Sequence, residues 1–263
     1  WTVLLGSPET EKPHSISIGD DGSIFVTGYT EGDLDGQVNS GFSDAFISKF
    51  NSDGIKDWTR LLGSPSYEEG NGVTSSNDGS IYVAGSTKGS LDGQINNGSY
   101  DAFISKYDSR GEREWTRLLG SSEHDTAYGI SISKDKSIYI TGGTSGNLNG
   151  QMNNGSSDAF ITKYNSEGVK DWTKLLGSSE FDSAYDISIS EDGSIYIAGY
   201  TFGDLDGQIN NGDKDAFISK FNSDGEKDWT RLLGSSVEEE ALSISSESDR
   251  SIYIAGFARG DLD

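Results

Sequence analysis

The sequence contains no cysteine, one methionine, two histidines and three prolines among 263 residues. The lack of cysteine excludes a disulfide framework and thiolate chemistry. Zinc and other soft-metal centres need cysteine or histidine ligands, and His14 and His124 are too few to build one. No Ser-His-Asp or Cys-His set can be recognised, so we expect that the protein is not an enzyme.

Long apolar runs and basic residues are also scarce. No segment approaches the roughly 18 apolar residues that a membrane helix needs, so we expect no membrane insertion. Only 20 Lys and Arg residues stand against 43 Asp and Glu residues, which gives a formal charge of −23. This charge would repel nucleic acids and anionic membranes, and we expect neither as a partner.

What the sequence does contain is a repeat. Tryptophans recur at intervals of 57 residues, and each opens a near-identical stretch such as "WTRLLGS". The repeats begin at Trp1, Trp58, Trp115, Trp172 and Trp229, and the last one is truncated. A fixed period of this length indicates a solenoid, a propeller or another repeat architecture. The chain stops at "GDLD", inside a repeat, which we interpret as a sign that it belongs to a larger polypeptide or assembly.

Each repeat contains four strand-like runs. In the fourth repeat these are strand A (185–190), strand B (194–200), strand C (215–221) and strand D (228–234), all rich in Ile, Tyr, Phe or Trp. The connecting segments "EDG" and "NSDGEK" are typical of tight turns. Nothing in the repeat combines a helical period with helix caps.

The strands carry apolar side chains on both faces. In strand B, Ile195 and Ile197 point to one face, and Tyr196 and Ala198 point to the other. A sheet that is apolar on both faces must pack between two neighbours, and radial stacking in a β-propeller provides them. We therefore predict an all-β fold, with residues 1–263 as a single β-propeller domain of about five four-stranded antiparallel blades. A linear β-solenoid is the alternative, although its coils are usually shorter.

One segment, residues 158–201, reads "DAFISKYNSEGVKDWTKLLGSSEFDSAYDISISEDGSIYIAGYT". It combines a "DAF" strand, a "W…LG" strand and a hairpin around "DGSIYIAG", and this pattern returns in every repeat. The pattern resembles the bacterial β-propeller repeat called SBBP. The resemblance implies a propeller from a secreted or cell-surface bacterial protein, and it implies no catalytic residues.

The loops divide into a constant set and a variable set. With strand A innermost and strand D outermost, as in similar propeller repeats, the B–C and D–A loops share one face of a blade. The D–A loop varies most, from "PETEKPH" to "SVEEEAL", and variable loops on a rigid scaffold usually carry binding. We expect a protein or glycan partner at this acidic face. The acids of the D–A loops are Glu9, Glu11, Glu68, Glu69, Glu123, Asp125, Glu180, Asp182 and Glu238 to Glu240.

The B–C loop, "GDLDGQINNG" in the fourth repeat, resembles half of a calcium loop. Calcium prefers carboxylate and carbonyl oxygens, so Ca²⁺ is the cofactor that this loop could bind. The candidate metal ligands are Asp33, Asp35, Asp92, Asp204 and Asp206. The alternative is turn formation, because Asn147, Asn149 and Ser90 replace the acids in other repeats. Asp, Asn and Ser share the ability to form local turn hydrogen bonds.

Three further positions keep their chemical type from repeat to repeat. The "DAF" aspartates are expected to accept backbone N–H bonds where the loop enters strand C, with metal binding as the alternative. The strand-C lysines are expected to be solvated or locally paired, and the strand-D bases to guard an exposed sheet edge. These residues are Asp44, Asp101, Asp158 and Asp215; Lys49, Lys106, Lys163 and Lys220; and Arg60, Arg117, Lys174 and Arg231.

The predicted function is that of a non-enzymatic structural or binding propeller in an extracellular or cell-surface bacterial protein. Two alternatives stay open: a lectin-like propeller that binds a ligand on the B–C/D–A face, and a calcium-stabilised adhesion module. A lectin would be expected to repeat its pocket residues, whereas the exposed loop aromatics differ between repeats. These aromatics are Phe42, Tyr67, Tyr100, Phe181 and Phe202.

Overall fold

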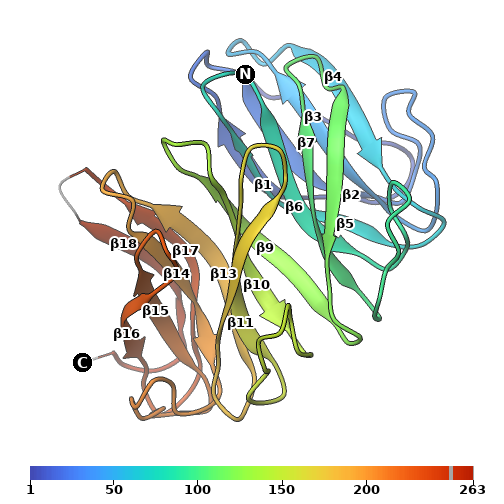
Figure 1. The fold of residues 1–263 in the computed structure, drawn as a ribbon. Coiled ribbons are helices and arrows are strands. Elements are labelled where there is room, and N and C mark those ends of the chain that lie inside the picture. The colour runs from blue at the N-terminus through green and yellow to red at the C-terminus, as the bar shows by residue number, and fades with distance from the viewer. Residues whose placement is uncertain (249–250, 263) are drawn as a thin grey trace. The chain divides into compact units, whose positions relative to one another are not determined.

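The computed structural model describes residues 1–248 and 251–262, and within this part the chain is all-β, with eighteen strands and no helix (Figure 1). The strands are β1 (Glu11–Ile18), β2 (Ile24–Thr30), β3 (Asp44–Phe50), β4 (Lys56–Leu62), β5 (Glu68–Ser75), β6 (Ile81–Thr87), β7 (Asp101–Tyr107), β8 (Arg113–Leu119), β9 (Asp125–Ile132), β10 (Ile138–Thr144), β11 (Asp158–Tyr164), β12 (Lys170–Leu176), β13 (Asp182–Ile189), β14 (Ile195–Thr201), β15 (Asp215–Phe221), β16 (Lys227–Leu233), β17 (Glu239–Ser246) and β18 (Ile252–Ala258). No membrane-spanning helix is found among these residues. Asp263, which ends the fifth copy of the B–C loop, lies outside the described residues.

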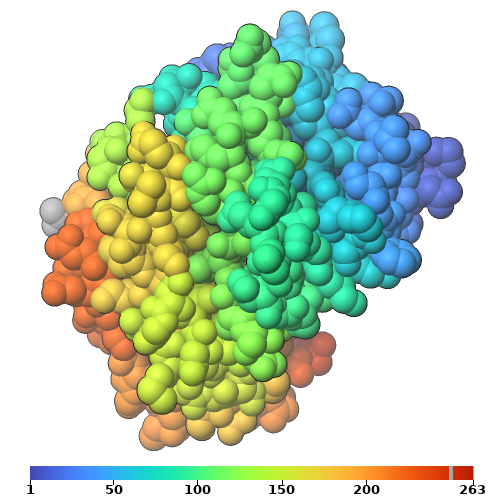
Figure 2. Space-filling view, turned by 45° about the vertical axis from the view of Figure 1, so that its right-hand side comes forward, coloured from blue at the N-terminus to red at the C-terminus, as the bar shows by residue number. Residues whose placement is uncertain are grey.

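The chain divides into two compact units, Trp1–Ile130 and Ser131–Asp263. The first unit contains the antiparallel sheets β1-β2-β3-β4 and β5-β6-β7-β8, and the second contains β13-β14-β15-β16 and the hairpin β17-β18. A further sheet has the order β12-β11-β10-β9, and β9 crosses the boundary between the units. Within each unit, successive repeats form adjacent bands on the surface (Figure 2). The prediction of one domain over residues 1–263 stays a prediction.

Each complete sheet spans one 57-residue period, with strands A to D in chain order as the sequence predicts, and its strand D carries the tryptophan that opens the next repeat. Strand A is longer than predicted. In the fourth repeat it begins at Asp182 and not at residue 185, because Asp182 already pairs with Thr201. A β-bulge between Ala184 and Asp186 lets the two ends of this strand pair with one continuous strand B.

The tight turns between strands C and D repeat one local design. In the fourth repeat, the side-chain oxygen of Asn222 accepts hydrogen bonds from the N–H groups of Asp224 and Glu226, at 3.1 and 2.9 Å. Gly225 has a φ of +76°, a backbone conformation that favours glycine. The spacing "N-x-D/E-G" is therefore scaffold chemistry, which explains why these turns hardly vary between repeats.

The sheets pack face to face within each unit. In the first unit, Phe25, Ala45 and Ile47 of one sheet are buried against Val73, Val83 and Phe103 of the next. In the second unit, Tyr196, Ala198 and Ala216 pack against Ala241 and Ile244. Each large apolar side chain buried in this way contributes about 1.5–3 kcal/mol, so the junctions between blades are the main source of stability.

The strands labelled A approach one another at these junctions. The Asn71 side chain on β5 donates to the carbonyl of Ala127 on β9, at 2.9 Å. In the second unit, Asp186 on β13 accepts hydrogen bonds from the Ser243 hydroxyl and the Ile244 N–H on β17, both at 2.9 Å. The A strands thus form the side on which neighbouring sheets converge, as expected for the inner strands of propeller blades.

The strand-C lysines are locally paired, which confirms one of the two roles expected for them. Each forms an ion pair with the acid that precedes the tryptophan of strand D. The pairs are Lys49–Asp57 (3.5 Å), Lys106–Glu114 (2.9 Å), Lys163–Asp171 (3.7 Å) and Lys220–Asp228 (2.9 Å).

Candidate binding face and blade junctions

The "GDLDGQ" part of the B–C loop folds back onto strand D. Leu205, at its centre, is fully buried. The Gln208 side chain donates to the carbonyl of Thr230 and accepts the N–H of Leu232 at 3.3 Å. Gln208 therefore bonds to two backbone groups of β16 that face no further strand. The loop protects the outer edge of the blade, where an unpaired strand would otherwise be open to aggregation.

The second acid of this loop is a turn residue paired with a base. Asp35 has a φ of +54°, and Asp92, Asn149 and Asp206 have equivalent positive values. The Asp35 carboxylate accepts hydrogen bonds from the Lys56 ammonium and the Thr59 hydroxyl. Burial opposes ionisation here, but these hydrogen bonds and the Lys56 charge outweigh it and hold the pKa of Asp35 below its usual value.

The first acid caps the rest of the loop. Asp33 Oδ1 accepts the N–H of Asn39 at 2.9 Å, and Asp204 does the same for Asn210. In the third repeat Asn147 replaces the acid and makes the equivalent bond at 3.0 Å. These contacts support the turn-forming interpretation of the loop.

The five predicted calcium ligands lie in three separate loops: Asp33 and Asp35 in the first repeat, Asp92 in the second, and Asp204 and Asp206 in the fourth. No group of three or more Asp, Glu, His or Cys side chains within residues 1–248 and 251–262 is arranged to hold a metal ion. A cation at the second acid would have to replace its basic partner, Lys56 or Lys227, for example. Calcium binding by this loop stays a prediction.

The B–C and D–A loops meet at every junction between repeats, as antiparallel topology requires. Short parallel bridges join Ser43 to Tyr67, Tyr100 to His124, Ser157 to Phe181 and Lys214 to Glu238. The first two lie in the first unit and the last two in the second. The variable residues of one repeat are therefore placed beside those of the next.

In the first unit this contact assembles a row of rings. Phe42 and Tyr67 stack with centroids 4.8 Å apart and planes 7° apart. The Lys88 ammonium lies 5.6 Å from the centre of the Tyr67 ring and 6.0 Å from that of Tyr100. Tyr100 in turn contacts His124 at 4.9 Å. Phe42 is 63% exposed and Tyr67 39%, so the row is open to solvent.

The second unit has a related cluster built from different residues. Phe202 contacts Phe181 at 6.3 Å and Tyr200 at 5.7 Å. Lys214 lies over both Tyr200 and Phe202, at 4.5 and 5.0 Å, and also pairs with Glu240. Sequence reasoning treated the loop aromatics as scattered, since they differ between repeats. The tertiary contacts gather them because a residue of one loop meets a non-equivalent residue of the next.

The "DAF" aspartates accept backbone hydrogen bonds, as predicted. Asp44 accepts the N–H of Ser40 at 3.0 Å, and Asp101, Asp158 and Asp215 accept the equivalent N–H groups of the residues four positions earlier. All four aspartates are fully buried. The glycine that ends strand D has no room for a side chain: a Cβ on Gly177 would lie 2.1 Å from Oδ1 of Asp158.

One prediction about the acidic face was wrong. Glu11, Glu68, Asp125, Asp182 and Glu239 were assigned to exposed D–A loops, but each opens or nearly opens a strand. All except Glu11 are almost completely buried. Each accepts the N–H and hydroxyl of the serine four residues earlier, as Glu68 does from Ser64 at 2.6 Å. A signal was available: this position is acidic in all five repeats, while its neighbours vary.

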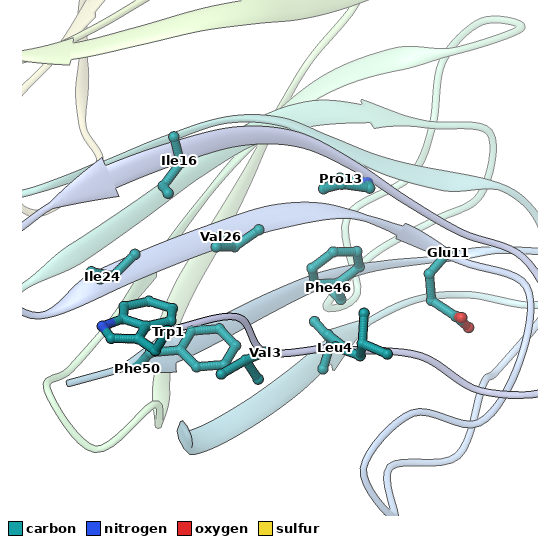
Figure 3. A pocket seen from close by; sticks show the side chains of 11 residues that line it. Trp1, Val3, Leu4, Glu11, Pro13, Ile16, Ile24, Val26, Phe46 and Phe50 are labelled. Carbon is teal, nitrogen blue, oxygen red and sulfur yellow. The ribbon is translucent and has the colours of Figure 1, made fainter. Parts of the chain in front are cut away.

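An apolar cleft lies between the N-terminal segment and the first sheet (Figure 3). Trp1 donates to the carbonyl of Ser52 at 3.3 Å, as Trp58 donates to Ser109. The segment thus takes the place beside the first sheet that β4 takes beside the second. The cleft has a volume of about 350 Å³ and is lined by residues such as Ile16, which corresponds to the buried Val73 one repeat later.

The four-stranded sheets, their 57-residue period and their face-to-face packing define a β-propeller repeat protein. The SBBP family, described as "Beta-propeller repeat", matches residues 57–92, 114–149 and 171–206. These three repeats are SBBP β-propeller repeats, which confirms the resemblance read from the sequence.

The chain is also similar to longer proteins. It is 26% identical over 165 residues to the regulatory protein FlaEY of Caulobacter vibrioides, covering 56% of this chain and 17% of that one. It is 22% identical over 257 residues to a WD repeat-containing protein of Acanthamoeba polyphaga mimivirus, covering 76% and 18%. The chain therefore spans less than a fifth of these relatives.

Two solved enzymes share the fold. A virginiamycin B lyase from Staphylococcus aureus superposes with a TM-score of 0.52 at 15% identity, covering 96% of this chain and 66% of the lyase. A puromycin hydrolase superposes with a TM-score of 0.54 at 13% identity, covering 96% and 38%. At these identities the likeness concerns the fold and not the activity.

Proposed function

We propose that the chain is a non-enzymatic binding scaffold of a secreted or cell-surface bacterial protein, and that it contacts its partner through the B–C/D–A face. The observation that carries this proposal is the exposed row Phe42–Tyr67–Lys88–Tyr100–His124 on an otherwise constant framework. Aromatic side chains exposed on variable loops are typical of interaction surfaces.

The chemistry of the loops supports a role without catalysis. His14 bonds to Asn71 and His124 to Thr126, each at 3.0 Å, so neither contact is with a carboxylate of the kind that orients a general base. The second acids of the B–C loops, Asp35, Asp92 and Asp206, are each paired with a base. Similarity to a regulatory protein is in keeping with such a role.

A basic protein surface is the partner that the charge favours. The chain carries a net charge of −23, which attracts lysine- and arginine-rich surfaces. Lys88 already lies over two of the rings, and a lysine of a partner could use the exposed outer face of Phe42 in the same way. The acidic surface would increase the association rate, and the rings would provide short-range specificity.

The experiment is a binding assay of the labelled chain on an array of lysine- and arginine-containing peptides. We expect binding that weakens with salt and that is lost in a Phe42→Ala/Tyr67→Ala/Tyr100→Ala variant. The control is Ile55→Ala/Val169→Ala, which removes exposed apolar side chains from C–D turns. The absence of binding, or equal loss in both variants, would refute the proposal for this surface.

A lectin-like function is the second candidate, and the stacked pair Phe42 and Tyr67 favours it. Flat exposed rings can pack against the apolar faces of sugars, with the Tyr67 hydroxyl as a hydrogen-bonding group. The same two variants on a glycan array distinguish the candidates. A sugar that binds the control variant but not the triple variant would establish this alternative.

A further inference from the structure

Two acids that sequence reasoning placed apart are neighbours at the blade junctions. In the first unit, the N–H of Asp125 donates at 2.9 Å to the carbonyl of Tyr100, the residue just before Asp101. In the second unit, the N–H of Asp182 donates at 2.8 Å to Ser157, the residue just before Asp158. The head of one strand C thus lies beside the head of the next strand A. All four aspartates are 0% exposed.

The hydrogen-bond donors at these pairs are too few for two ionised carboxylates. Asp101 Oδ2 accepts the N–H of Asn97 at 3.1 Å and its side-chain amide at 3.5 Å, and Asp158 accepts the N–H of Asn154 at 3.1 Å and its side-chain amide at 3.2 Å. Asp125 Oδ2 accepts the N–H and the hydroxyl of Ser121, at 2.6 and 2.8 Å. The Oδ1 atoms of Asp101 and Asp125 are buried and have no donor, and Asp182 Oδ1 is in the same situation. A buried anionic oxygen without a donor or a counter-charge is strongly unfavourable.

The groups that face Asp101, Asp158 and Asp182 supply no positive charge. Asp101 is surrounded by the N–H groups of Asn97 and Gly98 and by Asp125. In the second unit, Asp158 faces Asn154, Gly155 and Asp182, and Glu180 adds further negative charge near Asp182. No Lys, Arg or His contributes to the pKa of these three groups.

The pKa values follow from this environment. Burial, together with the charge of Asp182, raises the pKa of Asp158 to about 6. Burial and the charge of Asp125 raise the pKa of Asp101 in the same way. Glu11 differs from these acids in two respects, because it is only partly buried and no "DAF" aspartate lies beside it. Burial opposes its ionisation, but hydrogen bonds from Ser7 and Thr30 prevail and lower its pKa.

We propose that each of two buried junctions, Asp101 beside Asp125 and Asp158 beside Asp182, is a proton-binding site that takes up one proton under mildly acidic conditions. The proton belongs to the pair and not to one residue, as in other coupled carboxyl pairs. It gives one donor-free oxygen a donor and halves the buried charge of the junction. The proton is then a structural ligand that holds neighbouring blades together.

The sign of the effect on stability follows from the direction of the pKa shifts. A carboxyl whose pKa is higher in the folded chain binds its proton more tightly there than in the unfolded chain. Its contribution is complete below the unfolded value near 4 and is lost as the pH rises through the folded value, about 6 for Asp158. Folding should therefore be most favourable under mildly acidic conditions.

The test compares urea midpoints of the wild type and Asp101→Asn/Asp158→Asn from pH 5 to pH 8. Asn keeps the shape and supplies donors without needing a proton. We expect the urea midpoint of the variant to exceed that of the wild type at pH 8 and to approach it at pH 5. Asp204→Asn is the matched control, because Asn147 fills the equivalent position and this acid lies in an exposed loop. The urea midpoint of this control should change with pH as it does in the wild type.

A proton count provides a second readout that does not depend on the variant being stable. Near pH 5, unfolding of the wild type should release about two more protons than unfolding of the double variant. Parallel pH profiles or equal proton release would overturn the proposal. So would a stabilisation by Ca²⁺ at pH 8 that EDTA reverses and the double variant lacks, because the pairs would then hold a metal ion and not a proton.

Discussion

The glycine that ends strand D tests the junction geometry directly. A Cβ on Gly177 would lie 2.1 Å from Oδ1 and 2.2 Å from Cγ of Asp158, far inside van der Waals contact. Asp158 cannot move freely, because it is buried and accepts the Asn154 N–H at 3.1 Å. Gly177→Ala must therefore displace either the carboxylate or the backbone.

The expected cost can be estimated from these contacts. Overpacking of a buried site costs about 1–3 kcal/mol, and loss of a hydrogen bond to a charged group about 1.5–3 kcal/mol. Replacing glycine stabilises by about 0.4–1 kcal/mol through the unfolded chain. We expect Gly177→Ala to lower the free energy of unfolding by roughly 2–4 kcal/mol in all.

The assay is urea unfolding followed by tryptophan fluorescence, with two comparisons. Gly143→Ser is the control, because a Cβ there comes no closer than 3.0 Å to the side chains of Ser183 and Ser157, and Ser86 fills the equivalent position. Asp158→Ala removes the atoms that a Cβ on Gly177 would strike. In that background Gly177→Ala should cost far less, which gives a coupling energy of about 2 kcal/mol or more. A loss below 0.5 kcal/mol, or additive effects, would refute the geometry.

Three further outcomes are expected. Asp206→Ala should lower the urea midpoint, since alanine at a φ of +56° costs about 1–2 kcal/mol, whereas Asp206→Asn should cost less because Asn149 fills the equivalent position. Burial raises the pKa of Tyr107 to about 12, so alkaline difference absorbance should show a late-ionising tyrosine that Tyr107→Phe removes. Calcium should raise the melting temperature no more than magnesium does, because lysines already pair with the loop acids; a calcium-specific rise that EDTA reverses and that Asp206→Asn reduces would place the ion in the B–C loop.

Much of the scaffold could be predicted because the same local sequence pattern recurs in each repeat. The 57-residue period, the four strands and the role of the "DAF" aspartates as N–H acceptors all follow from local patterns that recur at the same spacing. Turn formation by the B–C loop could also be inferred, since Asn149 in place of an acid suits a positive φ. Local hydrogen bonds depend on residues close in sequence, and the sequence displays these directly.

The buried acids could not be placed in the same way. Asp125 looks like a surface charge next to Glu123 and His124, and its burial depends on a loop 25 residues earlier that covers it. Nothing in the local pattern distinguishes an acid that receives hydrogen bonds from one that faces solvent. The early start of strand A, which brings Asp182 into the sheet, depends on pairing with Thr201 in the same way.

The sequence by itself determined the repeat, the strand order within a blade and the scaffold turns, because these depend on contacts within one 57-residue unit. Only the tertiary structure decided which residues of neighbouring repeats come into contact. There the ring row forms from Tyr67 and Tyr100, which are not equivalent positions, and Asp101 meets Asp125 in a buried pair. These two contacts join residues at different phases of the repeat, so the 57-residue period does not reveal them.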